Sequence, residues 1–540
     1  MPVTVFTNGR VFHPESSGNS FASSLVIDGS QILYVGSVND ERVRQAQLKG
    51  TTVDLNGRAI LPGFIDGHVH ILNFGLSLQK LDLLQCKSLS EIRDAIKSYA
   101  AQNPSEPRIL CRGWLQVVTG GTALASAIDD LDPRPIYIES LDLHSTWCNS
   151  AAIRELQVDS MSDPPGGTIH RLPDGRPSGL VDEAVQFNVV WPFLNQAASA
   201  EKRIAAIEAA LSAHRRAGYT GLVDMAMDEM NWEALNLYRN RYGDPPLHIG
   251  AHWLIPYTRD HAEFHRVIDR AIELHKDYNS ANSPALRING IKLICDGTVD
   301  GCTAGLLQPY GGLTDLVEPI WPAPAMKEAV QRATNSGLQC ALHAIGDRTV
   351  RDAINCLSEV QNLRDCRHRI EHLELTTPED AKRLGDLGII ASVQPVHSDP
   401  ATFGAWQGLI GEHRCNRAFA YRDFADSGAP LVFGTDAPTA KHLPLPNLYN
   451  ATTRRSALEP TMTETVNAQF ALPLATAVSA ATSGAAFAGF ADSWTGSLRP
   501  GLQADFVIID MNWNPDKLLE AQVCQTWYKG EKVFDIADGV

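Results

Sequence analysis

The stretch that decides the fold is Leu61-Pro62-Gly63-Phe64-Ile65-Asp66-Gly67-His68-Val69-His70. Residues 59–65 form an apolar run that is too short for a helix and is bounded by glycines, so we expect a short buried strand here. His68 and His70 follow it, and alternate residues of an extended chain project from the same face. Neutral imidazole is a common ligand of zinc and similar ions. The pair is therefore a candidate metal site, with two ordinary strand histidines as the alternative.

Seven further strand-like runs follow along the chain, with helical patterns between most of them. Counting the first, the runs lie at residues 64–65, 219–225, 247–254, 291–295, 339–343, 369–373, 389–393 and 431–433. One spacer helix has a clear start, with Thr377 as the cap, Pro378 in the first turn and an acid at Asp380. Eight strands alternating with helices predict an α/β fold, the (β/α)8 TIM barrel, which places its chemistry at the C-terminal strand ends.

The two ends of the chain carry short strand patterns separated by turn signals such as Asn8-Gly9 and Asp28-Gly29. Neither end has enough strands for a stable sheet by itself. We therefore expect one small β-sandwich domain built from residues 1–60 plus 490–540, with the barrel at residues 61–489 inserted in it. Residues 75–190 exceed what one strand-to-helix connection needs, so we expect an insertion subdomain over the barrel mouth that shapes the substrate pocket.

Composition restricts the classes of partner that we expect for this 540-residue chain. Its formal net charge of -16 argues against nucleic acid and anionic membranes, because phosphate binding needs a basic face. Residues 1–6 lack the pattern of a signal peptide, and no stretch approaches the roughly 20 apolar residues of a membrane span. We expect a cytoplasmic protein with a small-molecule substrate. A homodimer stays open, because helices outside such barrels often carry dimer contacts.

Ligand-type residues stand at the ends of five predicted strands. Besides His68 and His70 they are Lys292, His343, His372 and Asp436. A single buried histidine is usually only hydrogen-bonded, but this joint pattern predicts one shared site at the barrel rim. Nitrogen ligands with one carboxylate suit a divalent metal, with zinc as the first candidate and manganese or iron as alternatives. Such an ion lowers the pKa of bound water towards neutrality, and Asp436 can accept the proton.

Two residues of this rim have competing interpretations. A protonated amine is a poor metal ligand, whereas a Lys292 carbamylated by carbon dioxide would be an anionic bridge between two metals. The alternative is an ion pair of Lys292 with Asp296 or Asp300. His397 follows Gln394-Pro395 and faces the same rim. A contact with the substrate, support of the metal ligands and a plain surface role are all open for it.

The motifs together resemble those of a known family. They include Leu61 to His70, Arg112-Gly113-Trp114, Asp142 to Ser150, Gly166-Gly167-Thr168, Asp174 to Gly179, Ile291-Lys292-Leu293, His343 to Asp347, Gln394-Pro395, and Gly496 to Asp505. Over nearly its whole length the chain resembles the amidohydrolase superfamily. More narrowly, it resembles the amidohydrolase family 3 branch that includes N-substituted formamide deformylases.

The resemblance implies roles for individual residues. His68, His70 and Asp436 would hold one metal, His343 and His372 a second, and a carboxylated Lys292 would bridge them. Asp436 would be the general base. The insertion would contribute Trp114, His144 and Trp147 to the substrate pocket, with His144 a candidate for contacting the substrate oxygen. The sequence departs from the family pattern at Leu115-Gln116 and at residues 437–442, where substrate choice is made.

Three functional hypotheses follow. The first is a metal-dependent amidohydrolase that cleaves a non-peptide carbon–nitrogen bond, such as a linear amide or formamide, with metal-activated water. The second keeps the metal site and changes the reaction to deamination, ester hydrolysis or decarboxylation in a specialised pathway, because fold and ligands do not separate these reactions. The third is a catalytically silent relative that binds a partner or regulates. Silent relatives usually lose ligands, and here every expected position is filled.

Overall fold

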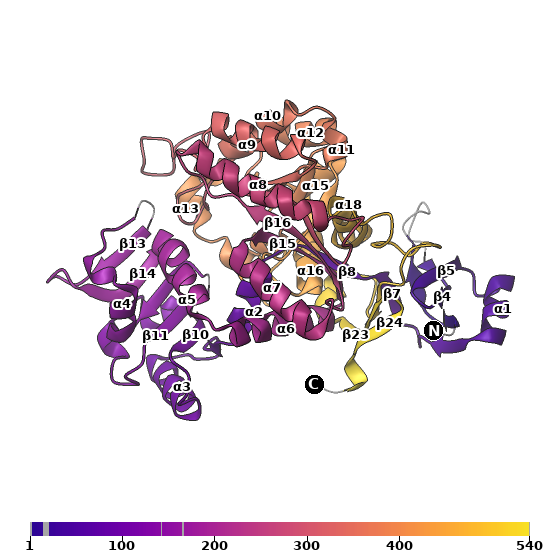
Figure 1. The fold of residues 1–540 in the computed structure, drawn as a ribbon, viewed down its shortest axis with the longest axis horizontal. Helices are drawn as coiled ribbons and strands as arrows, with labels where there is room; N and C mark the ends of the chain where they lie inside the picture. The colour runs from indigo at the N-terminus through magenta and orange to yellow at the C-terminus, as the bar shows by residue number, and fades with distance from the viewer. Residues whose placement is uncertain (1–2, 14–20, 142, 165–166, 539–540) are drawn as a thin grey trace. The chain divides into compact units, whose positions relative to one another are not determined.

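The structure is a computed structural model, and it describes residues 3–13, 21–141, 143–164 and 167–538. Asp142 and Gly166, which belong to two of the motifs above, lie outside the described residues. The chain divides into two compact units (Figure 1). The first unit comprises Met1–Ile71, Leu211–Trp232 and Arg239–Val540, and the second comprises Leu72–Ala210 and Glu233–Tyr238.

An eight-stranded parallel sheet forms the centre of the first unit. Within the described ranges its strands are β8 (Phe64–Val69), β15 (Tyr219–Met227), β16 (His248–Leu254), β17 (Leu286–Ile294), β18 (Gln339–Ala344), β19 (Arg369–His372), β20 (Ile390–Val393) and β21 (Leu431–Phe433). Each strand pairs with the next in chain order. Backbone bonds then join the two edges, because the His68 carbonyl accepts from Asp436 N at 2.7 Å and the Ala437 carbonyl accepts from His70 N at 2.9 Å. The predicted (β/α)8 barrel is confirmed.

Helices separate the barrel strands in the chain. They include α6 (Ala200–Arg216), α7 (Glu229–Tyr242), α8 (His261–Asp277), α9 (Ala323–Asn335), α10 (Asp347–Ser358), α12 (Pro378–Leu387), α15 (Tyr421–Asp426) and α16 (Pro444–Thr453). Figure 1 shows α8, α9, α10 and α12 as a layer along the barrel strands. The start of α12 matches the prediction, since the Thr377 side chain accepts from the Asp380 N–H and Pro378 occupies the first helical position.

The apolar run at residues 59–65 is two strands rather than the single one expected. β7 (Ala59–Pro62) pairs with β22 (Phe506–Asp510) in a sheet built from both chain ends, and β8 begins the barrel. Gly63 separates them, and a β-carbon there would lie 2.2 Å from the Thr220 hydroxyl oxygen. Glycine is therefore required at this junction because the backbone passes too close to a neighbouring strand for any side chain.

Two sheets contain strands from the ends of the chain. One has the order β5 (Gln31–Gly36), β4 (Ser24–Asp28), β1 (Val3–Thr7) and β6 (Thr51–Asp54). The other has the order β24 (Glu531–Asp535), β23 (Gln522–Tyr528), β22, β7, β2 (Arg10–Phe12) and β3 (Phe21–Ala22). Their shared core joins residues far apart in the sequence, as the Phe6 ring lies 5.2 Å from that of Phe506 and 5.4 Å from that of Trp527. Helix α1 (Glu41–Lys49), capped by Asp40, was not predicted.

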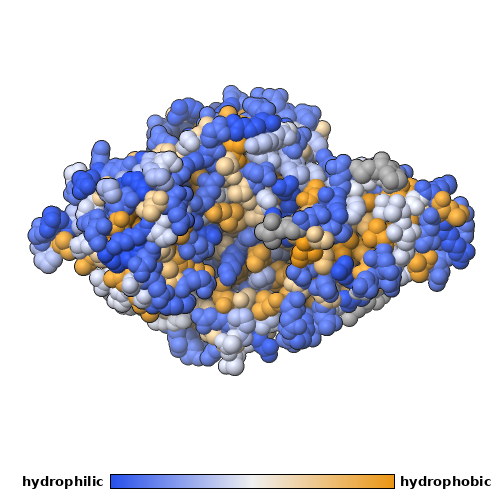
Figure 2. Space-filling model, turned by 90° about the horizontal axis from the view of Figure 1, so that it is seen from below, coloured by the Kyte–Doolittle hydropathy of each residue, from blue (hydrophilic) through white to orange (hydrophobic). Residues whose placement is uncertain are grey.

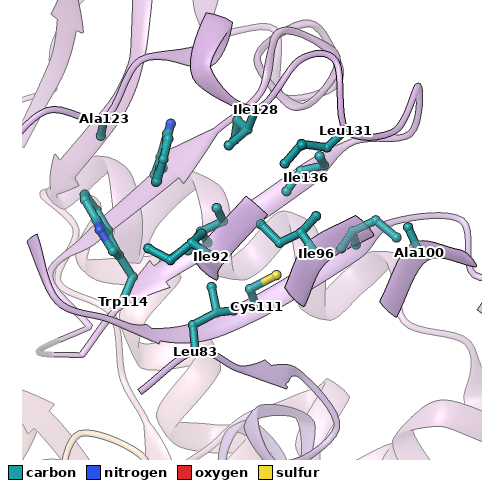
Figure 3. Close-up of a cluster of buried hydrophobic side chains, with 13 residues drawn as sticks. Leu83, Ile92, Ile96, Ala100, Cys111, Trp114, Ala123, Ile128, Leu131 and Ile136 are labelled. Carbon is teal, nitrogen blue, oxygen red and sulfur yellow. The ribbon is translucent and has the colours of Figure 1, made fainter. Parts of the chain in front are cut away.

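The second unit has a mixed six-stranded sheet of its own. Its order is β13 (Gly167–Arg171), β14 (Pro177–Glu183), β12 (Ser145–Cys148), β11 (Ile136–Ser140), β10 (Ile109–Trp114) and β9 (Leu81–Asp82). Helices α2 (Ile71–Leu78), α3 (Leu89–Gln102), α4 (Ser150–Leu156) and α5 (Trp191–Ala197) accompany it. One face of α3, with Ile92, Ile96 and Ala100, packs with Cys111 of β10 and Ile136 of β11 in a hydrophobic core (Figure 3).

One face of the molecule is mainly hydrophilic (Figure 2). Figure 2 shows a face on which polar residues predominate and apolar ones are interspersed, in keeping with the 20% of charged residues. Within the described residues, every helix is too short or too polar to cross a lipid bilayer.

Candidate metal centre

Three predicted ligands converge where the barrel closes. Asp436 Oδ1 lies 3.0 Å from His70 Nε2 and 3.4 Å from His68 Nε2. His68 and Asp436 are buried, and the His70 side chain is 27% exposed. In this set of two imidazoles and one carboxylate, the three possible ligand atoms all lie within 4.8 Å of one another.

The seam between β8 and the end of β21 creates this convergence. The Asp66 side chain accepts hydrogen bonds from Thr435 N at 2.9 Å, from Thr435 Oγ1 at 2.6 Å and from His68 N at 3.2 Å. Asp66 is fully buried, so these bonds hold the two chain segments together without competition from water. Asp436 adopts φ 58°, a left-handed conformation that Asp and Asn tolerate better than most residues.

His343 and His372 complete a group of rings on neighbouring strands. Their ring centroids lie 4.3 Å apart, and the His372 ring lies 5.0 Å from that of His68. His343 Nε2 also lies 3.4 Å from Asp296 Oδ1. The structure thus brings His68, His70, His343, His372 and Asp436 into one region at the C-terminal ends of the barrel strands.

Burial keeps His68, His343 and His372 in their neutral form. It lowers the pKa of His68 to about 4 and that of His343 to about 3, and in both cases the charge of Lys292 adds to the effect. It also lowers the pKa of His372 well below its usual value. Burial opposes ionisation of Asp436, but the surrounding imidazoles outweigh it and hold the pKa of this carboxyl low. Neutral imidazoles and an ionised carboxylate are the forms that bind a metal ion.

Lys292 lies on β17 and is 2% exposed. Burial lowers the pKa of its amine, against the attraction of Glu371 and Asp436. Its proposed ion-pair partner Asp296 is engaged elsewhere, because its carboxylate accepts from the backbone N–H groups of Gly305, Ile345 and Gly346 at 2.9–3.0 Å. The other candidate, Asp300, accepts from the Trp406 indole at 3.1 Å.

A second group of possible ligands includes a carboxylate that the sequence analysis did not single out. Donor atoms of His372, Glu374 and His397 lie within 4.8 Å of one another. His397 Nδ1 is 3.3 Å from Glu374 Oε1, and its Nε2 is 3.8 Å from Asp436 Oδ2. Burial opposes protonation of His397, but the hydrogen bond to Glu374 and the charge of Asp436 raise its pKa. Glu374 stands two residues after His372, and this spacing was the available signal.

A buried charged pair was also missed. Glu371 Oε2 lies 2.7 Å from His68 Nδ1, and Glu371 Oε1 accepts from Arg369 Nε at 2.5 Å. Arg369 and Glu371 are both fully buried. Two charged residues at alternate positions of a fully buried strand are unusual, and this pattern could have marked them as functional.

The three residues predicted to line the pocket belong to the second unit. Trp114 and Trp147 are 1% and 0% exposed, and their ring centroids are 5.3 Å apart. Both lie in the core of that unit, where Figure 3 labels Trp114. The Trp147 indole donates to the Leu124 carbonyl at 3.0 Å. His144 is partly exposed, with Nδ1 3.0 Å from Glu183 Oε2. The aromatic packing explains the burial of both tryptophans, and a substrate contact of any of the three stays a prediction.

The donor set fits a divalent cation. Among the residues that the structure describes, Asp436 Oδ1 and His372 Nδ1 are buried without a hydrogen-bond partner. Two nitrogen atoms approach Asp436 Oδ1 to 3.0 Å and 3.4 Å, yet neither is aligned to donate a proton to it. Buried polar atoms normally find partners, and an ion shared between these residues would supply one to each of these two atoms.

Comparison with known proteins identifies the family of this chain. The model of the amidohydrolase family matches residues 51–534. The protein LONG AFTER FAR-RED 3 of Arabidopsis thaliana is 31% identical over 556 residues, covering 98% of this chain and 91% of that protein. The N-substituted formamide deformylase of Arthrobacter pascens is 23% identical over 540 residues, covering 95% of both chains.

A solved structure shares the fold. An uncharacterized metal-dependent hydrolase from Pyrococcus horikoshii OT3 superposes with a TM-score of 0.76 at 23% identity, covering 95% of this chain and 98% of the other. The family match and the full-length likeness lead to one conclusion. This chain belongs to the amidohydrolase family.

Proposed function

We propose that this protein is a metal-dependent hydrolase that cleaves a non-peptide carbon–nitrogen bond, such as that of a linear amide or an N-substituted formamide. The observation that carries the proposal is the approach of His68 Nε2 and His70 Nε2 to one unbonded oxygen of Asp436. Membership of the amidohydrolase family supports hydrolysis. The likeness to an N-substituted formamide deformylase over 95% of the chain supports the bond type.

Individual residues have separate roles in the proposed reaction. His68, His70 and Asp436 would hold one ion, and His343 and His372 would hold a second one, with a carboxylated Lys292 between them. Zinc fits this set first, with manganese or iron as alternatives. When bound, the ions would supply Lewis-acid chemistry that makes water a better nucleophile and the scissile carbonyl more electrophilic. Asp436 accepts a proton through Oδ2, the oxygen that faces His397, and passes it to the leaving nitrogen.

A substrate panel tests the proposal. The protein, loaded with zinc or manganese in bicarbonate buffer, is assayed with N-substituted formamides, linear amides, esters and amines that can be deaminated. We expect turnover of a formamide or amide, with release of the amine, and none in Asp436→Asn. Turnover confined to esters, to deamination or to decarboxylation would contradict the proposed bond type but would be compatible with the proposed metal site. A metal-loaded protein that is inactive on every class would favour a silent regulatory relative.

Expectations about the substrate, the compartment, the partners and the oligomeric state rest on the sequence alone. They are a small-molecule substrate, a cytoplasmic location, the absence of nucleic acid and membrane partners, and a homodimer as an alternative to the monomer.

A further inference from the structure

Glu371 makes a contact that the proposed chemistry does not use directly. Its carboxylate lies 2.7 Å from the Nδ1 atom of His68, on the side of the ring opposite to Asp436. The side chains of His68 and Glu371 are 1% and 0% exposed, so water does not compete for this bond. An ionised carboxylate only accepts hydrogen bonds, so the proton of the neutral His68 ring stays on Nδ1. Nε2 is then left with its lone pair towards Asp436.

The carboxylate itself is fixed by donors of two residues, Arg369 and Ser392. Arg369 Nε donates to Glu371 Oε1 at 2.5 Å, and Ser392 Oγ donates to Glu371 Oε2 at 2.6 Å. Arg369 also donates to the Gly67 carbonyl at 2.7 Å, one residue before His68. Its guanidinium therefore links the strand that carries Glu371 to the strand that carries His68. Each of these groups is buried.

Gln394 is the only rival for the same imidazole nitrogen among the described residues. Its amide Nε2 lies 3.3 Å from His68 Nδ1, compared with 2.7 Å for the Glu371 oxygen. A bond to an ionised acceptor is both shorter and stronger than one between neutral groups. The carboxylate therefore decides which nitrogen of His68 carries the proton.

We propose that Glu371, held by Arg369 and Ser392, is a positioning residue that fixes the His68 tautomer so that Nε2 is available to a metal ion. The inference rests on the proposed function, since it needs a metal at the Asp436 side of the ring. Partners of this kind orient metal-binding histidines, and their loss typically costs 10- to 100-fold in metal affinity.

Glu371→Gln tests the tautomer directly. Arg369 has donors only, and its closer contact is Nε to Oε1 at 2.5 Å, compared with 3.2 Å from Nη2 to Oε2. The amide oxygen of the new side chain therefore takes the Oε1 position, and the amide nitrogen takes the Oε2 position towards His68. An amide N–H facing Nδ1 requires a lone pair there, which moves the imidazole proton to Nε2. The substitution hardly changes the volume of the side chain. It nevertheless reverses the direction of the hydrogen bond between residue 371 and His68 Nδ1.

Two further variants separate this effect from general damage. Glu139→Gln is the matched control, because Glu139 is a buried glutamate of the second unit that pairs with Lys80 at 2.5 Å and with the Trp191 indole at 2.9 Å. Glu371→Asp keeps a counter-charge for Arg369 but withdraws the acceptor from His68. It serves where Glu371→Gln does not fold, as judged by circular dichroism of the metal-free proteins.

The measurement is Co²⁺ binding to the metal-free proteins, with the dissociation constant from titration and the ligand geometry from the visible d–d spectrum. We expect wild type and Glu139→Gln to agree, and Glu371→Gln and Glu371→Asp to bind about 10- to 100-fold more weakly with an altered spectrum. Folded Glu371 variants with wild-type affinity and spectrum would overturn the inference and leave the proposed function standing. A wild type that binds no Co²⁺ would overturn both.

Discussion

Asp505 offers a quantitative test of the burial of one carboxylate in the C-terminal segment of the chain. It is 2% exposed, and its carboxylate accepts from Lys529 N and from Thr495 Oγ1, both at 2.7 Å. Burial raises its pKa from 3.8 to about 6, against these two hydrogen bonds. The substitution Asp505→Asn removes the charge and keeps both contacts, because the amide oxygen accepts from Lys529 N and the amide nitrogen donates to Thr495 Oγ1.

The sign of the effect follows from proton binding. Between pH 3.8 and about 6 the folded state holds a proton on Asp505 that the unfolded state has released. Stability therefore falls as pH rises through this window, and the loss is complete above the folded-state pKa. A difference of about 2 pKa units corresponds to about 3 kcal/mol at neutral pH. About 1 kcal/mol of this is already lost near pH 4.5, so about 2 kcal/mol remains to be lost between pH 4.5 and 7.5.

Urea unfolding of metal-free wild type and Asp505→Asn at about pH 4.5 and about pH 7.5 measures this difference. The other titrating groups are common to both proteins and cancel in the comparison. We expect Asp505→Asn to gain about 2 kcal/mol in its free energy of unfolding relative to wild type over this interval. A difference that does not change with pH, or one that favours wild type as pH rises, would refute the reasoning.

Three further predictions concern the barrel. Asp436→Asn should reduce turnover of any substrate found by at least about 100-fold while circular dichroism stays unchanged, and undiminished turnover would contradict its role as base. Thr435→Val should lower the free energy of unfolding by about 1.5–3 kcal/mol, because Asp66 loses a buried donor, and a thermal midpoint equal to wild type would show that this bond does not hold the seam. Gly63→Ala should destabilise the protein by about 1–3 kcal/mol through its contact with Thr220, and Thr220→Ala should relieve part of that loss.

The barrel could be predicted because its strands are short, apolar and separated by helices with clear starts. The run at residues 431–433 became β21 and the Thr377 cap became the start of α12. The junction near Gly63 could not be predicted in the same way, since one continuous apolar run serves two sheets. Which sheet a residue joins depends on a partner strand far away in the sequence, here β22. The local sequence pattern contains no information about that partner.

Some residues of the candidate site could likewise be predicted from the sequence, and others could not. His68, His70 and Asp436 could be predicted because ligand-type residues at strand ends must meet at the barrel rim. Glu371 and Glu374 were missed because their roles depend on which face of β19 points to which neighbour. The bond from Glu371 to His68 spans 303 positions of the chain. For Trp114 and Trp147, the sequence pattern does not distinguish a pocket wall from the core in which both rings pack.

The metal content of the protein tests the central claim most directly. Protein purified without chelator is analysed for zinc, manganese and iron by elemental analysis, beside Lys292→Met prepared in the same way. We expect close to two ions per chain in wild type and close to one in the variant. One ion in both proteins would be compatible with a hydrolase but would contradict the bridging role of Lys292. Absence of metal in wild type, even after incubation with zinc or manganese and bicarbonate, would contradict the account.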